Sequence, residues 1–371
     1  MTDAQSAPTS VRGALRSGQK VGPYTICHPL GDGASGIVYR AEREDGRQSP
    51  VALKVIHRHL VRDPQVSRRF HREAQILGQL RGPNLAALLD AGEAEDGRLY
   101  MALELVEGEP LDVVARRGPL PIEQAIDIAL QICSALELAH EHGVVHRDLK
   151  PGNVILSRGA DGELNVRVLD FGMAKLLRVE ASQTLTALTE ANMVFGTPEY
   201  MAPEQARGED VDARCDVYAL GIVLYELLTG HVPFSASTPI GVMTAHLVQE
   251  PPPPSSRTTA SPIPPALEAV VLHALAKSPE DRYPSAAALA AALGSARREP
   301  RNVASTAPPP PDDLGLRDTA LALQFAATQR FSAVPGADVR ATPGQRTWWV
   351  VAIVAALAGV LAGVAASLAS G

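Results

Sequence analysis

The chain has 371 residues, of which 46% are hydrophobic and 20% charged, and its formal net charge is −7. This length is enough to bury a sizeable core, and the composition is that of a globular protein. The negative charge argues against a nucleic-acid-binding protein. Cys27, Cys133 and Cys215 stand far apart without a C-x-x-C pair. This spacing argues against a disulfide framework or zinc site and favours reduced, buried, inert thiols.

The first part of the chain carries a strand pattern. Residues 1–20 are small, polar and basic, and we expect them to be disordered and to hold no cleavable signal. Strand-like patterning then runs from residue 24 to residue 102, with Asp-Gly turn signals at residues 45–46 and 96–97. One helix is predicted within this region, at residues 68–80. Its apolar residues share one face: Phe70, Ala74, Leu77 and Leu80.

From residue 121 onward the pattern is helical. Residues 121–139 begin with proline and repeat apolar residues at helical spacing. Four more helical segments follow, at residues 217–228, 240–247, 266–275 and 286–293. A β-rich first third followed by a helical remainder predicts an α+β protein with two lobes.

The composition changes again at the C-terminal end. Residues 296–346 are rich in proline and small polar residues, which is typical of a tether. Residues 348–368 carry no charge, and at 1.5 Å per residue they would span about 31 Å, close to the thickness of a bilayer core. Two tryptophans stand at the start of this stretch, where a membrane interface would lie. We predict a transmembrane helix over residues 347–369; a buried C-terminal helix is the alternative.

The residues with the most informative chemistry lie at positions 146–172, which read HRDLKPGNVILSRGADGELNVRVLDFG. This stretch places two carboxylates, a lysine and an asparagine on one short loop and the strand pair after it. Phosphoryl transfer requires a catalytic carboxylate, a cation and two oxygen ligands for Mg²⁺. In that order, the candidates are Asp148, Lys150, and the pair Asn153 and Asp170.

A glycine-rich stretch precedes this loop. Residues 30–38 read LGDGASGIV and fit the pattern G-x-G-x-x-G-x-V, whose glycines let a hairpin backbone close over phosphates. Dinucleotide-binding folds use a similar spacing, but they require a helix at this point. Here a strand-like Ile37-Val38-Tyr39 follows, and then a second strand, VALK, which ends at Lys54.

These motifs, in this order, resemble the bacterial eukaryotic-like (Hanks-type) serine/threonine protein kinases over residues 21–295. The resemblance implies the two-lobed protein-kinase fold, with a β-rich N-lobe at residues 21–106 and a helical C-lobe at residues 107–295. It implies ATP and Mg²⁺ or Mn²⁺ as cofactors, and transfer of the γ-phosphate to Ser or Thr hydroxyls of protein substrates. The residues expected to bind ATP are Leu30, Gly31, Asp32, Gly33, Ala34, Ser35, Gly36, Val38, Ala52, Lys54, Glu104 and Val106.

The resemblance also implies individual roles. Asp148 would accept the proton of the substrate hydroxyl, and Lys150 would stabilise the transferring phosphoryl group. Glu73 would pair with Lys54 and hold it against the α- and β-phosphates. Leu103 would stand at the gatekeeper position, and Glu104 with Val106 would offer backbone hydrogen bonds to adenine.

Further residues are expected to support the helical lobe and to regulate it. Asp216, in DVYALG, would brace the catalytic loop, and Arg282 would pair with Glu204 of the A-P-E sequence. The activation segment follows DFG and ends with residues 196–204, GTPEYMAPE. Arg147 would supply a cation for a phosphate on this segment. The expected phosphorylation sites are Thr184, Thr186 and Thr189.

The span and the tether suggest where the protein works. Arg330, Arg340 and Arg346 precede the apolar span and no basic residue follows it, which predicts a single-pass protein of the inner membrane with its kinase domain in the cytoplasm. Gly359 and Gly363 form a G-x-x-x-G pair, so a homodimer through the span or the kinase domain is a further expectation.

Three alternatives remain beside the kinase interpretation. A catalytically weak pseudokinase or scaffold on the same fold would be expected to lack a catalytic lysine, aspartate or metal ligand, and none is missing. A small-molecule phosphotransferase would not need the A-P-E segment. A membrane anchor protein would work mainly through a partner.

Overall fold

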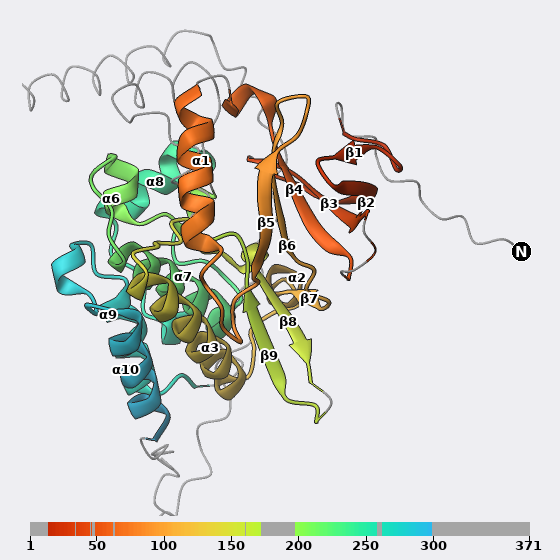
Figure 1. Ribbon diagram of the computed structural model, residues 1–371. Coiled ribbons are helices and arrows are strands. Elements are labelled where there is room, and N and C mark those ends of the chain that lie inside the picture. The colour runs from red at the N-terminus through yellow and green to blue at the C-terminus, as the bar shows by residue number, and fades with distance from the viewer. Residues whose placement is uncertain are drawn as a thin grey trace, which may run out of the picture. The chain divides into compact units, whose positions relative to one another are not determined.

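The computed structural model describes residues 14–33, 35–44, 46, 49–61, 64–159, 161–171, 197–257 and 262–298. They belong to one compact unit, Met1–Val303. The N-lobe is an antiparallel sheet in the order β1-β2-β3-β4-β6-β5, with α1 beside β5 (Figure 1). Its elements are β1 (Lys20–Val21), β2 (Tyr24–Gly33), β3 (Gly36–Arg43), β4 (Val51–Ile56), the 3₁₀ turn η1 (Arg58–Val61), α1 (Pro64–Leu77), β5 (Leu88–Glu93) and β6 (Leu99–Glu104).

The C-lobe is helical, with one small antiparallel sheet in the order β7-β8-β9 (Figure 1). The sheet consists of β7 (Glu109–Pro110), β8 (Val154–Arg158) and β9 (Leu164–Val168). The helices are α2 (Leu111–Ala115), α3 (Ile122–Glu141), α6 (Pro203–Arg207), α7 (Arg214–Thr229), α8 (Pro239–Val248), α9 (Pro265–Ala274) and α10 (Ala286–Arg298). Short 3₁₀ turns occur at η2 (Pro151–Asn153), η4 (Pro198–Tyr200), η5 (Pro254–Ser256) and η6 (Pro279–Asp281).

Helix α7 forms the centre of the C-lobe core. Its residues are apolar on nearly all sides, and almost every one of them is buried. A helix that is hydrophobic all round must be covered by other elements, and α3, α9 and α10 contact it. The C-lobe is therefore built around a helix that is buried along almost its whole length.

In strand β6 of the N-lobe, alternating side chains divide between two cores. Leu99 and Met101 of β6 belong to the large core, whereas Tyr100 and Ala102 belong to a small outer core on the other face of the sheet. This is the period of two expected for a strand covered on both faces. The two-lobed α+β fold expected from the sequence is confirmed.

The helices predicted within the described residues all form, with shifted ends. The helix expected at residues 68–80 is α1, which begins at Pro64 and ends at Leu77, just before Gly78. Proline suits a first turn and glycine suits a helix end, and these two signals set the limits. The short elements α2, α6 and β7 were not expected, because two to five residues are too few for a periodic pattern.

Two expectations need correction near the N-terminus and at a cysteine. Residues 14–20 are ordered, because Leu15 packs against the outer core and its N–H donates to Tyr39 Oη at 2.9 Å.

All three cysteines are free thiols. Cys133 and Cys215 are buried as expected, but Cys27 on β2 is only half-buried. Burial, with Glu137 nearby, raises the pKa of Cys133 to about 12, and burial likewise raises that of Cys215.

The predicted tether and membrane span lie outside the described residues, apart from residues 296–298 at the end of α10. Among the helices that the structure describes, none has both the length and the apolar character needed to cross a membrane.

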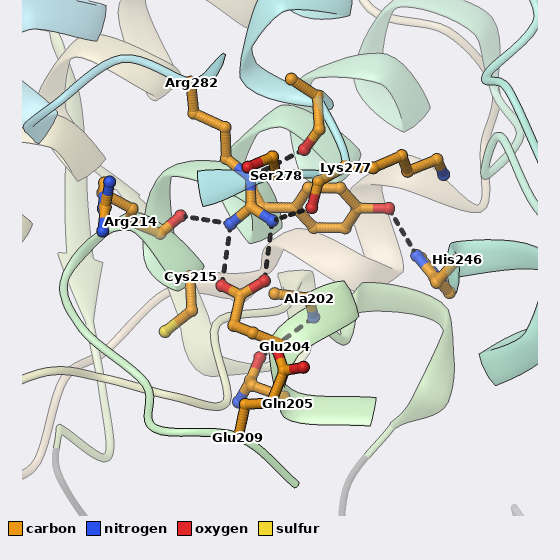
Figure 2. A network of polar contacts seen from close by, with 12 residues as sticks. Ala202, Glu204, Gln205, Glu209, Arg214, Cys215, His246, Lys277, Ser278 and Arg282 are labelled. Atoms are coloured by element: carbon orange, nitrogen blue, oxygen red, sulfur yellow. Dashed lines mark hydrogen bonds and ion pairs between the residues drawn. The ribbon is translucent and has the colours of Figure 1, made fainter. Parts of the chain in front are cut away.

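A buried ion pair links α6 to the segment that precedes α10, and it confirms the expected pairing of Arg282 with Glu204. Arg282 Nη1 lies 2.8 Å from Glu204 Oε1, and Nη2 lies 2.7 Å from Oε2, an arrangement that Figure 2 shows from close by. The remaining guanidinium donors bind the carbonyl oxygens of Arg214, Ala276 and Lys277. Every N–H of this cation thus has an acceptor, as a buried charge requires.

We predict that Arg282→Met lowers the free energy of unfolding by about 3–5 kcal/mol, because it leaves the Glu204 carboxylate buried without a cation. Urea unfolding followed by circular dichroism measures the change. The double variant Arg282→Met, Glu204→Gln removes both charges and should recover part of the loss. A loss below about 1 kcal/mol in the single variant would contradict a strong pair.

A second prediction concerns the connection between the lobes. A Cβ added at Gly108 would lie 2.3 Å from the Leu156 carbonyl oxygen and 2.7 Å from Ile155 Cγ2. Gly108→Ala should therefore lower the free energy of unfolding by about 1–3 kcal/mol. The matched control is Gly294→Ala inside α10, where a Cβ meets only ordinary contact; it should raise the same quantity by about 0.5–1 kcal/mol. Equal effects of both substitutions would rule out this close approach.

Candidate active site

A buried carboxylate of α7 binds the backbone at the start of the catalytic loop. Asp216 is 0% exposed and accepts hydrogen bonds from the backbone N–H groups of His146 (2.8 Å) and Arg147 (2.9 Å) and from His140 Nε2 (2.8 Å). Burial alone would raise the pKa of Asp216, but the His140 hydrogen bond and the nearby His146 outweigh it and hold the pKa below its usual range. The expected bracing role of Asp216 is confirmed.

This bracing stabilises an unfavourable backbone conformation. Arg147 has φ +67°, in the left-handed region that a non-glycine residue adopts only at a cost of about 1–2 kcal/mol. The Asp216 bond to the Arg147 N–H offsets this cost. Gln205 adds a second support, because its Nε2 donates to the Arg147 carbonyl oxygen at 2.8 Å. Gln205 could not be predicted from the sequence, because it belongs to no catalytic motif.

Asp148, Lys150 and Asn153 come together on this loop. Lys150 Nζ donates to Asp148 Oδ2 at 2.9 Å, and Asn153 Nδ2 donates to the Asp148 carbonyl oxygen at 2.8 Å. Asn153 Nδ2 also lies 3.4 Å from Asp148 Oδ2. Both side-chain contacts use Oδ2, so within the described residues Oδ1 remains available to accept a proton from a bound hydroxyl.

Asp170 is joined to the same loop. Leu169 donates its N–H to the Asn153 carbonyl oxygen at 2.8 Å, and His146 Nε2 bonds to the Leu169 carbonyl oxygen at 2.9 Å. The Phe171 ring packs edge-on against His146 with centroids 4.7 Å apart. Asp170 itself has φ +61°. The aspartate is therefore fixed on both sides by contacts to the catalytic loop.

Lys54 reaches from the N-lobe to this aspartate. It is 4% exposed, and its Nζ donates to Asp170 Oδ2 at 2.6 Å. Glu73 lies on α1, as expected. In the part of the chain that the structure describes, the ion pair of Lys54 is with Asp170, and this carboxylate neutralises the buried ammonium. The expected pairing of Lys54 with Glu73 stays a prediction.

The strand register places three of the expected ATP-binding residues, Val38, Ala52 and Lys54, on one face of the sheet. Val38 stands opposite Lys54, and Ala52 stands opposite Leu103. Gly33 stands opposite Gly36 at the end of the hairpin, with Ala34 outside the described residues. A Cβ at Gly36 would lie 2.2 Å from the Val55 carbonyl oxygen, so this glycine is required for close packing of β3 on β4.

Glu104, at the end of β6, has one of its two backbone groups already occupied. Its backbone N–H already donates to the Ala87 carbonyl oxygen at 2.8 Å, which leaves its own carbonyl for adenine. Its side-chain Oε2 accepts from Arg167 Nη1 at 3.2 Å, and Arg167 also donates to the Leu85 carbonyl oxygen. Arg167 was not anticipated, because an arginine on a strand carries no signal of its partner.

Asn153 and Asp170 form a donor set that fits Mg²⁺. The amide nitrogen of Asn153 donates to Asp148, which leaves the amide oxygen for a metal ion. Asp170 follows Leu169, whose N–H donates to the Asn153 carbonyl oxygen. The described residues contain no group of three or more His, Cys, Asp or Glu side chains that could hold a metal. Mg²⁺ is commonly held by one or two protein oxygens together with phosphates and waters, so two ligands suffice.

Comparison with known proteins agrees with this geometry. The family profile described as protein kinase domain matches residues 24–292. The chain is 42% identical over 283 residues to serine/threonine-protein kinase pkn3 of Myxococcus xanthus, covering 76% of this chain and 51% of that protein. It is 43% identical over 274 residues to serine/threonine-protein kinase PknB of Mycolicibacterium smegmatis, covering 73% of this chain and 42% of that protein.

The chain thus spans about half the length of these curated relatives. Among solved structures, the PknI kinase domain of Mycobacterium tuberculosis superimposes with a TM-score of 0.60 at 29% identity, covering 76% of this chain and 100% of that one. With its fold, its catalytic loop and these matches in agreement, the chain belongs to the protein kinase family, and within it resembles the bacterial serine/threonine kinases.

Proposed function

We propose that the chain is a serine/threonine protein kinase that transfers the γ-phosphate of ATP to hydroxyl groups of protein substrates. The observation that carries this proposal is the arrangement of Asp148, Lys150 and Asn153 on one braced loop, joined through Leu169 to Asp170. A proton acceptor, a cation and two metal-binding oxygens linked in this way are the parts that phosphoryl transfer uses.

In the proposed reaction, the substrate hydroxyl oxygen forms a bond to the γ-phosphorus while the bond from that phosphorus to the β-bridging oxygen breaks. ADP leaves with the electron pair, and Asp148 Oδ1 accepts the hydroxyl proton. Lys150, 2.9 Å from Asp148 Oδ2, stabilises negative charge beside the reacting oxygen. Lys54 binds the phosphates of ATP. Mg²⁺ or Mn²⁺ at Asn153 and Asp170 would neutralise phosphate charge when bound.

Preference for Ser and Thr over Tyr rests on the DLKPGN loop and on Thr197, together with the names of the relatives. Thr197 stands directly before η4, whose Tyr200 hydroxyl donates to Glu226 of α7 at 2.6 Å. This bond fixes the loop against which a substrate segment would lie. We propose that this loop receives a segment of a protein substrate.

We propose that phosphorylation of the activation segment by the kinase itself raises its activity. The segment, with Thr184, Thr186 and Thr189, lies outside the described residues. Support comes from Arg147, whose Nε is buried without a hydrogen-bond partner among the residues described. A phosphate is an acceptor that could satisfy this cation.

We also propose that residues 347–369 anchor the protein in the inner membrane, with the kinase domain in the cytoplasm. The support is in the sequence: an uncharged stretch, two tryptophans at its start and three arginines before it. Gly359 and Gly363 would let two such helices pack closely, so a homodimer that phosphorylates in trans is part of this proposal.

We predict that Asp148→Asn and Lys54→Met each lower the rate of phosphate transfer to a protein substrate by about 10²-fold or more, because one removes the proton acceptor and the other the phosphate anchor. Labelled ATP and mass spectrometry measure the transfer. Asp161→Asn, in the turn between β8 and β9, is the matched control and should be neutral. Near-normal transfer by Asp148→Asn would refute the mechanism, and activity that survives a metal chelator would refute the metal site.

For the activation segment, the triple variant Thr184→Ala, Thr186→Ala, Thr189→Ala should lose most of its activity, because no phosphate can then pair with Arg147. Mass spectrometry of the active wild-type enzyme should find phosphate on at least one of the three residues. Thr244→Ala, which removes a hydroxyl that donates to the Ile240 carbonyl oxygen, serves as the control. Full activity of the triple variant would exclude this form of regulation.

For the membrane anchor, cell fractionation should place the protein with membranes, and protease added outside intact cells should leave the kinase domain uncut. The double variant Val360→Arg, Leu361→Arg should move the protein to the soluble fraction, because each arginine at the centre of a span costs about 2.5–3.5 kcal/mol. Wild-type protein in the soluble fraction would show that the anchor does not exist.

A further inference from the structure

The glycine-rich hairpin is tied to the end of β4 by one residue that no motif singles out. His57 follows Ile56, the last residue of β4, and its backbone N–H donates to the Ser35 carbonyl oxygen at 3.2 Å. Its side chain reaches across to the other arm of the hairpin, where Nε2 lies 3.0 Å from the Gly33 carbonyl oxygen. Because a carbonyl only accepts, Nε2 carries the proton and donates it.

His57 acts from the face of the sheet that looks away from ATP. Along β4, Leu53 and Val55 belong to the outer core, whereas Ile56 belongs to the large core. Side chains alternate between faces in a strand, so Lys54 and Ile56 share the inner face and His57 continues the outer one. His57 therefore binds the hairpin on the outer face of the sheet and would not touch the nucleotide.

Among the described residues, packing contributes little at two glycines of the first arm of the hairpin. A Cβ placed at Gly31 would meet no atom within 4 Å, and one placed at Gly33 would meet only the Gly36 carbonyl oxygen at 3.7 Å. Glycine also has the largest backbone freedom of any residue. In a turn with so few packing contacts among the described residues, one side-chain hydrogen bond has a large share in fixing the backbone.

Two further contacts hold the His57 imidazole beside the hairpin. Asp32 Oδ1 lies 3.6 Å from His57 Nε2, and the His59 ring stacks on the His57 ring with centroids 5.4 Å apart. The His57 side chain is 28% exposed, so it is held by these contacts rather than enclosed by the core.

We infer that His57 is a positioning residue that holds the glycine-rich hairpin closed over the phosphates of ATP. This inference rests on the proposed ATP site. Without the Gly33 bond, the hairpin samples open positions, and the nucleotide loses backbone contacts to its phosphates. The affinity for ATP then falls, while the reacting groups at Asp148 and Lys150 stay in place.

The test uses the full-length protein and three variants: His57→Ala, His57→Gln and His59→Ala. His57→Ala should raise KM for ATP about fivefold, the size expected for losing one neutral hydrogen bond, with kcat and KM for the protein substrate unchanged. Gln can still donate to Gly33, so His57→Gln should restore most of the affinity. His59→Ala removes the stacked ring but no bond to the hairpin, and should leave KM unchanged.

Binding of a fluorescent ADP analogue gives a second readout that needs no catalysis, and thermal unfolding checks that each variant is folded. An unchanged KM and analogue affinity in His57→Ala would overturn the inference, as would a fall in kcat alone. Failure of His57→Gln to recover affinity would assign the effect to packing rather than to the hydrogen bond. If the wild-type protein itself binds no nucleotide, the proposed function fails and not only the role of His57.

Discussion

The arrangement of the active site depends on one buried carboxylate, that of Asp216. An ionised carboxylate is expensive to bury unless hydrogen-bond donors surround it, and the donors here are His140 and the backbone N–H groups of His146 and Arg147. These bonds hold Arg147 in its left-handed conformation, and that conformation sets the direction in which Asp148 leaves the loop. The central helix of the C-lobe thus determines where the catalytic carboxylate lies.

The same support extends to the N-lobe through a chain of contacts. His146 packs on Phe171 and binds the Leu169 carbonyl, which fixes Asp170 between them. Asp170 in turn binds Lys54 of β4. A displacement of β4 relative to α7 would therefore move or break the contacts of Asp170 first, because that residue is bonded to both lobes. Lys54 and Asp170 thus neutralise each other's charge.

The fold and most site positions could be predicted because they follow from local patterns. Spacing within HRDLKPGN and DFG places Asp148, Asn153 and Asp170 near one another, whatever lies between the lobes. The partners of long side chains could not be predicted in this way. The ion pair of Lys54 with Asp170 joins residues 116 positions apart in the sequence, and it depends on how the two lobes pack. Arg167, Gln205 and His57 bond to backbone oxygens far away in the sequence, and backbone acceptors leave no trace in residue identity.

The three thiols differ in a way that is useful in the laboratory. Burial raises the pKa values of Cys133 and Cys215, so neither presents a thiolate to a reagent at neutral pH. Cys27 is only half-buried, and it lies on β2, the strand that leads into the glycine-rich hairpin. The natural sequence therefore provides a single attachment point for a thiol-specific fluorophore or spin label, without any cysteine having to be removed. A label there would report on the movement of the hairpin directly.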